Sequence, residues 1–321
     1  MDKHLSILRP LLDDLPDHIF PKIYQSKIAE IASLLPPLEH GIIEFTERPY
    51  SQRVDLMICW FYSEAKSKGF VPMLDPFPEF KGLVEFLAHW KDEAKFLSSM
   101  IENIYLVFDL VDIEAPFVEP WMYLAFKRLY LPPDIILDLF IKSASFLPHQ
   151  IPGPSIPILL NILERTRDPY WVFGFGLLHQ RGEQLLRIGI ADFQNIESIA
   201  HFLAECDWQG NSDKLKAHLI FIESFTNNFV LSLKISDHIE TEIGIECILS
   251  KMNNYSAARI LIDYLVKHKF FNHHRAQAIL KILIPDQLVP KVPFRWLNHI
   301  KFNFDGEKMV AVKPYLYYEK H

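Results

Sequence analysis

The chain is organised by a unit that recurs five times, in which helical stretches precede a pair of short strands. Each unit is about sixty residues long, and its strands alternate apolar side chains with polar or aromatic ones. The last pair is the clearest, because the β-prone runs 299–304 and 309–318 flank Asp305-Gly306, a strong signal for a hairpin turn. Hairpins joined locally do not make parallel crossovers, so the pattern predicts one antiparallel sheet of about ten strands.

The two faces of this sheet differ in chemistry. In the last pair, Ile300, Phe302 and Val312 fall on one face, whereas Lys301 and Lys313 fall on the other. A sheet of this size tends to close into a barrel, with its apolar face outward beneath a ring of helices and its polar face around a cavity. Residues 1–321 are therefore predicted to form one α+β domain, an antiparallel β-barrel of five ααββ units. The alternative is an α+β sandwich with a wet polar face.

The predicted elements follow from periodicity and from the proline- and glycine-rich breaks between them. The strand pairs are 41–45 with 53–60, 104–111 with 117–126, 171–178 with 185–190, 229–235 with 241–248, and 299–304 with 309–318. The helices are 21–35, 81–103, 131–147, 155–166, 195–206, 212–227, 255–267 and 273–283. Residues 117–126 fit either a strand or the start of the next helix.

Composition limits the functions open to the chain. Half of the 321 residues are hydrophobic and 25 are Phe, which favours a large core. A net charge of −7 argues against broad nucleic-acid binding. The three cysteines, Cys59, Cys206 and Cys247, are too scattered for a disulfide framework or a zinc site. The N-terminus does not resemble a signal peptide, and no apolar run approaches the ~18 residues that span a bilayer, so a cytoplasmic protein without membrane contact is expected.

This layout resembles that of the ABBA prenyltransferases, whose barrel of five ααββ units encloses the active site. The resemblance covers nearly the whole chain as architecture, and its most specific local feature is Val312-Lys313-Pro314-Tyr315, a Lys-x-Tyr pattern on an inward strand face. In that family, such side chains bind the isoprenoid diphosphate from several strands. The matching inward positions here are Arg53, Arg187, Lys234, Lys301, Lys313 and Tyr315. The chain departs from the pattern because only its last strand carries a Lys-x-Tyr pair and Gly189 follows Arg187 on the inward face.

The resemblance implies transfer of a dimethylallyl or geranyl group from its diphosphate to a peptide or an aromatic natural product. The leaving diphosphate needs cations and hydroxyl donors, and the allylic cation needs a dry, π-rich wall. Candidates for that wall are Tyr105, Trp121, Tyr123, Trp171, Phe173, Phe175, Tyr315 and Tyr317. Taken singly, each cation also fits a solvated strand face, and each aromatic residue fits a plain core position.

Acidic residues on the same face are candidates for the base that takes the acceptor's proton. They are Glu44, Asp55, Asp109 and Glu246, of which the two glutamates rank first as catalytic residues. The same acids can equally pair with the interior lysines and arginines.

No metal site is predicted and no cofactor is required, although Mg²⁺ can accompany a diphosphate. Residues Asp13 to Asp17 match the DDxxD pattern with which other isoprenoid enzymes hold Mg²⁺, but a solvated helix end explains this short, proline-containing segment better. His273-His274 lacks a partner at metal-ligand spacing. The absence of P-loop, GxGxxG and GxSxG motifs gives no support to nucleotide-dependent or hydrolase functions.

Two other functions stay open. One is a non-catalytic scaffold of a natural-product pathway, which holds a peptide in the barrel or on its proline-rich loops. The other is a barrel enzyme of unrelated chemistry, because a fold does not fix a function.

Overall fold

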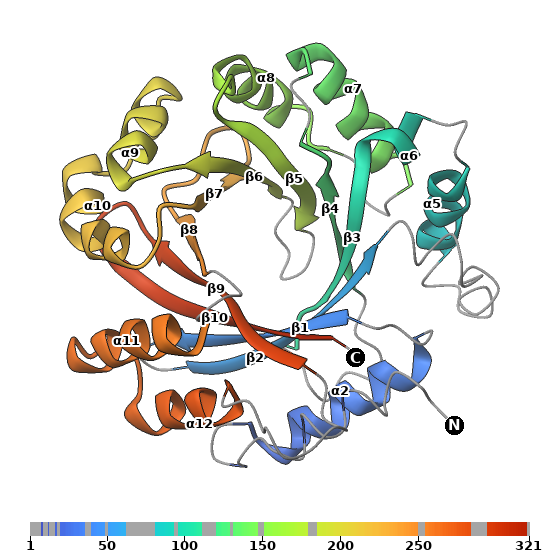
Figure 1. The fold of residues 1–321 in the computed structure, drawn as a ribbon. Helices are drawn as coiled ribbons and strands as arrows, with labels where there is room; N and C mark the ends of the chain where they lie inside the picture. Colours follow the sequence, from blue (N-terminus) through green and yellow to red (C-terminus); the bar gives the residue numbers. More distant parts are fainter. Residues whose placement is uncertain are drawn as a thin grey trace.

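Ten strands close into one antiparallel barrel in the computed structural model (Figure 1), in the order β1-β10-β9-β8-β7-β6-β5-β4-β3-β2. The structure describes Leu8, Leu12, Asp17 and residues 20–35, 40–48, 51–61, 81–92, 96–110, 120–128, 131–146, 151–178, 185–249, 254–283 and 294–319. The predicted closed barrel is confirmed, and the open sandwich is wrong.

Each strand pairs with its neighbour in sequence, and β1 pairs with β10 to close the ring. The strands are β1 (His40–Arg48), β2 (Ser51–Phe61), β3 (Ile101–Phe108), β4 (Trp121–Phe126), β5 (Trp171–Leu178), β6 (Leu185–Phe193), β7 (Phe229–Ile235), β8 (Ile243–Ile248), β9 (Phe294–Phe304) and β10 (Met309–Glu319). Residues 121–126 are thus a strand rather than the start of a helix.

The described helices lie outside the barrel, one of them before the first hairpin and two or three before each later hairpin (Figure 1). They are α2 (Lys22–Leu34), α5 (Lys81–Lys91), α6 (Phe96–Met100), α7 (Pro133–Ala144), α8 (Ser155–Arg165), α9 (Ile196–Glu205), α10 (Ser212–Leu219), the 3₁₀ helix η3 (Ile220–Ser224), α11 (Asn254–Lys267) and α12 (His273–Leu283). The predicted helix over 81–103 runs too far, because Ile101 and Asn103 pair with β4 and begin β3. No helix in the described ranges is long and apolar enough to cross a membrane.

The β9–β10 turn forms where the sequence predicts it. Gly306 takes the left-handed backbone conformation that glycine tolerates best, with φ of +93°. The Asp305 carboxylate accepts hydrogen bonds from the backbone N–H groups of Glu307 and Lys308, at 3.0 and 2.8 Å. These contacts fix the register of β10 on β9, which in turn decides which side chains meet inside the barrel.

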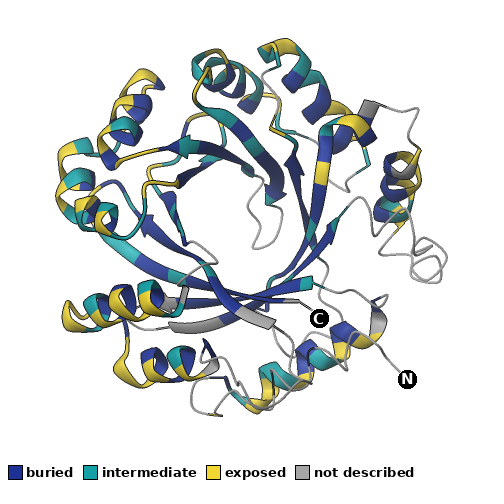
Figure 2. Cartoon of the chain, in the orientation of Figure 1, coloured by how far each residue is buried: buried dark blue, intermediate teal, exposed yellow. Residues whose placement is uncertain are grey.

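The main core lies between the barrel and the helices. As expected for the outward face of the strands, the following apolar strand residues are buried there, with at most 2% of their surface exposed: Val54, Leu56, Ile188, Leu233, Ile245, Phe302 and Val312. Figure 2 shows the same division, with buried strands and with helices that expose the side away from the barrel. The apolar face of each strand therefore packs against the ring of helices, and the opposite face lines the interior.

Candidate active site

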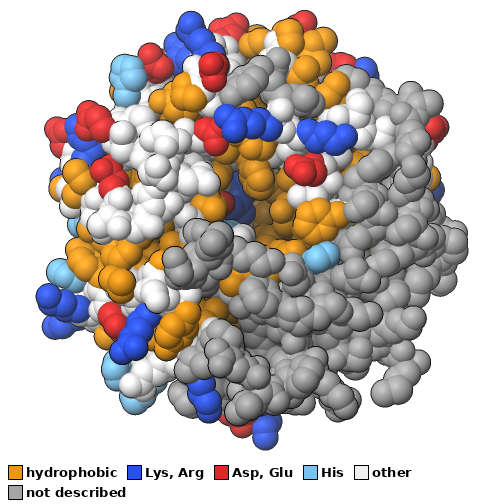
Figure 3. Space-filling model, in the orientation of Figure 1, with side chains coloured by type: hydrophobic (Ala, Val, Ile, Leu, Met, Phe, Trp, Pro, Cys, Tyr) orange, Lys and Arg blue, Asp and Glu red, His pale blue; other side chains and the backbone are white. Residues whose placement is uncertain are grey.

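The barrel holds a cavity of about 350 Å³. In the space-filling view it appears as a hollow at the centre of one face, with hydrophobic side chains around it and Lys or Arg deeper inside (Figure 3). The lining residues come from all ten strands and from Asn228, which precedes β7: Ile42, Met57, Tyr105, Trp121, Tyr123, Trp171, Phe173, Arg187, Ala191, Asp192, Asn228, Val230, Glu246, Ile248, Asn298, His299 and Tyr315. The described part of the interior has two chemically different halves.

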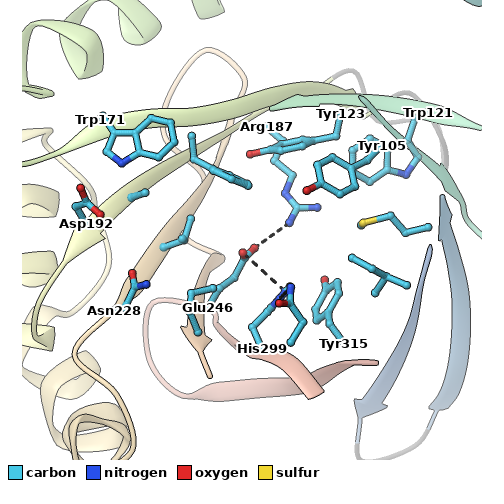
Figure 4. Close-up of a pocket in the computed structure, with 17 residues that line it drawn as sticks. Tyr105, Trp121, Tyr123, Trp171, Arg187, Asp192, Asn228, Glu246, His299 and Tyr315 are labelled. Carbon is cyan, nitrogen blue, oxygen red and sulfur yellow. Dashed lines mark hydrogen bonds and ion pairs between the residues drawn. The ribbon is translucent and has the colours of Figure 1, made fainter. Parts of the chain in front are cut away.

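The half formed by β2 to β5 is aromatic. Tyr105, Trp121, Tyr123, Trp171 and Phe173 line the cavity there, and adjacent rings lie 6.0–6.4 Å apart between centroids. Figure 4 shows Tyr105, Trp121 and Tyr123 grouped on one side of the cavity. A wall of this kind is apolar, and its ring faces attract cations.

Three glycines make room for Tyr123 in this wall. A Cβ at Gly174, Gly176 or Gly189 would lie 2.8, 3.0 or 2.4 Å from an atom of the Tyr123 side chain. Gly176 is directly opposite Tyr123 across the strands, and Gly174 is opposite Gly189. The glycines of β5 and β6 therefore allow a large ring to lie close against the barrel wall.

The prediction that Phe175 points inward is wrong. The pairing of β5 with β6 shifts by one residue between Val172 and Gly174, which is the effect of a β-bulge. Residues after the bulge exchange faces, so Phe175 is fully buried on the outer side. Its ring stacks on Phe140 of α7 at 4.2 Å between centroids.

The other half, from β6 through β10 to β1, is charged. Arg187 lies where the two halves meet, and its guanidinium carbon is 5.6 Å from the ring centroids of both Trp121 and Tyr123. Its Nε donates a hydrogen bond to Ser232 Oγ at 2.9 Å, and its Nη2 donates to Glu246 Oε1 at 3.4 Å. Figure 4 shows this guanidinium between the aromatic group and Glu246.

Glu246 is the carboxylate that lines the cavity. Its Oε1 accepts hydrogen bonds from Arg187 and, at 3.3 Å, from Lys301 Nζ, while its Oε2 lies 3.8 Å from His299 Nε2. Burial alone raises the pKa of Glu246, but the charges of Lys301 and Arg187 outweigh it and hold that pKa below the ordinary value. The group is therefore an anion at neutral pH.

The two β9 side chains beside Glu246 have depressed pKa values. Burial and the nearby Arg187 lower the pKa of Lys301 to about 7, against the opposite effect of Glu246. Burial lowers the pKa of His299 to about 4, so its imidazole is neutral at physiological pH. The His299 ring stacks on Tyr315 at 4.0 Å, and Asn298 Nδ2 lies 3.1 Å from its Nδ1. The Lys301 stem passes over Gly244, where a Cβ would lie 2.0 Å from its Cε.

A second buried ion pair lies behind the cavity lining, across the closure of the barrel. Lys313 Nζ donates to Glu44 Oε1 at 2.5 Å, and Thr46 Oγ1 donates to the same oxygen at 3.2 Å. Burial raises the pKa of Glu44, but Lys313 outweighs that effect and lowers the pKa to about 2. Burial and Glu44 raise the pKa of Tyr315 well above its ordinary value, so its phenol keeps the proton it can donate.

The predicted site residues differ in where they lie relative to the cavity. Five line the cavity: Glu246, Arg187, Tyr315, Tyr105 and Trp171. Lys301 does not line the cavity but contacts Glu246, which does. Glu44 and Lys313 pair with each other and are not among the lining residues. Lys234 and Tyr317 are not among the lining residues, since Lys234 pairs with Glu242 at 3.3 Å and Tyr317 packs on Trp296 at 4.0 Å.

The remaining candidates have other surroundings. Asp55 is buried and accepts a hydrogen bond from the backbone N–H of Leu110 at 3.0 Å, and the half-buried Asp109 does not line the cavity. The Arg53 side chain and Asp13-Asp14 lie outside the described residues. His273 and His274 are exposed. Within the described ranges, no three His, Cys, Asp or Glu side chains are grouped as a metal site would require.

Four polar lining residues were not among the predicted site residues. His299 begins the predicted strand 299–304, and its alternation with Ile300 predicts that it faces inward, whereas Asn298 directly precedes that strand. Asp192 sits at a register shift between Ile190 and Phe193, with φ of 73°, and pairs with Arg128 at 2.5 Å. Asn228 directly precedes β7. Periodicity alone does not locate these last two.

Several solved structures have a similar fold, and three of them are described below. AnaPT from Neosartorya fischeri has a TM-score of 0.65 and 12% identity, over 98% of this chain and 93% of that one. The 6-dimethylallyltryptophan synthase of Micromonospora olivasterospora, in complex with DMASPP and Trp, has a TM-score of 0.55 and 11% identity, over 87% and 81%. Prenyltransferase PriB, in a binary complex with product diphosphate, has a TM-score of 0.53 and 10% identity, over 99% and 94%.

These similarities show the fold, and the expected ABBA-type architecture is thereby confirmed. No protein-family model and no curated protein matches the sequence.

Proposed function

We propose that this barrel is an enzyme that transfers a short isoprenoid, dimethylallyl or geranyl, from its diphosphate to an aromatic acceptor. The observation that carries the proposal is the position of Arg187, which lies between two cavity-lining aromatic rings and a set of charged side chains. In prenyl transfer the allylic carbon–oxygen bond breaks into a diphosphate anion and an allylic cation, so charged and aromatic side chains must both lie next to that bond. The complexes of similar barrels with DMASPP and Trp, and with diphosphate, support this choice.

The leaving diphosphate is assigned to the charged half. Arg187, Lys301 and Lys313 supply positive charge, and the protonated phenol of Tyr315 supplies a hydroxyl donor. When the bond between the allylic carbon and oxygen breaks, its electron pair goes to the diphosphate, and these groups stabilise the new charge. Mg²⁺ enters the proposal as a companion of the diphosphate.

The allylic cation is assigned to the aromatic half. The rings of Tyr105, Trp121 and Tyr123 offer π faces to the cation and exclude water that would otherwise consume it. The aromatic acceptor shares this space, and one of its ring carbons forms the new bond to the isoprenoid. The proton lost from that carbon goes to an interior carboxylate, for which Glu246 is the candidate because it lines the cavity as an anion.

The acceptor is proposed to be an aromatic amino acid, free or within a peptide. A test incubates the protein with dimethylallyl or geranyl diphosphate and with tryptophan, tyrosine or short peptides that contain them. Mass spectrometry should detect a product heavier by one prenyl group, which the Arg187→Ala variant should form at least tenfold more slowly. Unchanged acceptors in every combination would contradict the proposal.

A second candidate is a binding protein without catalysis, and one observation favours it. In the described interior, every inward cation already has a carboxylate partner: Arg187 and Lys301 share Glu246, Lys234 pairs with Glu242, and Lys313 pairs with Glu44. A protein of this kind should gain no thermal stability from dimethylallyl thiodiphosphate, whereas an enzyme that binds it should.

A further inference from the structure

The Glu246 carboxylate uses its two oxygens differently. Oε1 holds two cations from different strands, Arg187 of β6 at 3.4 Å and Lys301 of β9 at 3.3 Å. Oε2 lies 3.8 Å from His299 Nε2, and Figure 4 shows Glu246 between Arg187 and His299. Glu246 and Lys301 are opposite each other in the β8–β9 ladder, so their contact is fixed by the sheet itself.

The two cations on Oε1 are also those that a diphosphate at the charged end of the cavity needs. Both are largely buried, with 16% of the Arg187 side chain and 6% of the Lys301 side chain exposed. A diphosphate that binds Arg187 and Lys301 competes with Glu246 for these two groups, because it carries more negative charge than one carboxylate and offers more acceptor oxygens. Glu246 and the diphosphate are therefore competitors.

Building on the proposed function, we propose that Glu246 is the internal counter-anion of Arg187 and Lys301. The isoprenoid diphosphate displaces Glu246 from both cations when it binds, and the freed carboxylate then accepts the acceptor's proton. In the empty barrel Glu246 keeps the two cations paired and in place. With the donor bound, the diphosphate replaces it, and Glu246 retains only its contact with His299.

This exchange couples the strength of the base to the presence of the donor. While Arg187 and Lys301 contact Oε1, they hold the pKa of Glu246 down, and the carboxylate is a weak base. Once the diphosphate neutralises both cations, burial becomes the stronger influence and raises that pKa. Glu246 thus becomes a good proton acceptor only when an allylic group is in the cavity.

The proton and electron balance of the step is complete. The allylic carbon–oxygen bond breaks with its electron pair on the diphosphate, and a carbon–carbon bond to the acceptor ring forms. The ring carbon then loses its proton to Glu246 Oε2, and the ring recovers its aromatic electrons. Release of diphosphate returns Arg187 and Lys301 to Glu246, which lowers its proton affinity and expels the proton to solvent.

Glu44 is not suited to this exchange. It does not line the cavity, and Lys313 and Thr46 both donate to its Oε1. Its role is to hold Lys313 in position.

Calorimetric titration with inorganic diphosphate and with dimethylallyl thiodiphosphate tests the competition. Glu246→Gln keeps the shape of the side chain but removes its charge, so it should bind both probes about tenfold more tightly than the unchanged protein. In prenylation of tryptophan, the same variant should be about a hundredfold slower, because the amide takes no proton. The matched control is Glu307→Gln, which removes an exposed carboxylate that pairs with Lys214 and should change neither value.

A structure of the unchanged protein with inorganic diphosphate provides a second test that does not depend on how the variant folds. Arg187 and Lys301 should contact phosphate oxygens, and both should have left Glu246. The inference is overturned if these contacts stay intact beside a bound diphosphate, if Glu246→Gln binds the probes no more tightly, or if that variant transfers at the unchanged rate. Failure of the unchanged protein to bind either probe would instead contradict the proposed function itself.

Discussion

Arg187 of β6 and Glu246 of β8 contact each other at 3.4 Å across the intervening strand β7. Ser232 of β7 accepts a hydrogen bond from the same arginine, so the guanidinium is held from two strands. Its other neighbours are the rings of Trp121 and Tyr123. One side chain therefore connects the aromatic and charged halves of the interior, and the predictions below depend on that division.

The first prediction concerns the buried pair of Lys313 and Glu44. Lys313→Ala should lower the free energy of unfolding by about 3–5 kcal/mol, because it leaves the Glu44 charge buried without its lysine. The double variant Lys313→Met with Glu44→Gln should recover most of that loss while remaining deficient in diphosphate binding. Chemical denaturation and calorimetry measure the two effects, and equal stability of the single and double variants would contradict the account.

The second prediction concerns the glycines behind Tyr123. Gly189→Ala should destabilise the protein by about 1–3 kcal/mol, because the new Cβ would lie 2.4 Å from the Tyr123 hydroxyl oxygen. Adding Tyr123→Phe removes that atom, and the next neighbours of the Cβ lie at 3.4 Å or beyond. Thermal denaturation should therefore show rescue in the double variant. Additive losses would mean that the ring does not lie against Gly189.

The third prediction concerns the pH dependence of stability. The pKa of Lys301 falls from 10.5 to about 7 on folding, so between these values the unfolded chain binds more protons than the folded one. Stability should therefore rise as the pH increases from about 7 toward 10, and the Lys301→Met variant should lack this part of the rise. Denaturant midpoints at several pH values measure this rise. The same pH dependence of stability in both proteins would contradict the lowered pKa of Lys301.

The fourth prediction concerns metal. Replacing both Asp13 and Asp14 by Asn should leave prenyl transfer within a few-fold, because the interior provides cations rather than a carboxylate cluster for the diphosphate. Activity assays with and without EDTA provide the readout. A collapse of turnover in the variant would show that the DDxxD match holds a metal.

The inward and outward faces could be predicted wherever the strands alternate without interruption. Ile300 and Lys301 show this, because a period of two assigns both faces once a hairpin turn sets the register. Phe175 follows one β-bulge and Asp192 lies within another irregularity of the pairing, and such shifts of the alternation leave no simple sequence signature. The charged contacts were predicted only as residue types on one face, because partners such as Lys313 and Glu44 are 269 positions apart and meet through barrel closure.

The most direct test of the proposed function is calorimetric titration of dimethylallyl thiodiphosphate into the unchanged protein, Arg187→Ala and Lys308→Ala. Lys308 is exposed near the β9–β10 turn, so its removal should leave the affinity unchanged. The account predicts binding to the unchanged protein that weakens about 30- to 1000-fold in Arg187→Ala, which corresponds to the ~2–4 kcal/mol of a desolvated charge contact. Equal affinity of the three folded proteins, or no binding to any of them, would contradict the account and favour a non-catalytic barrel.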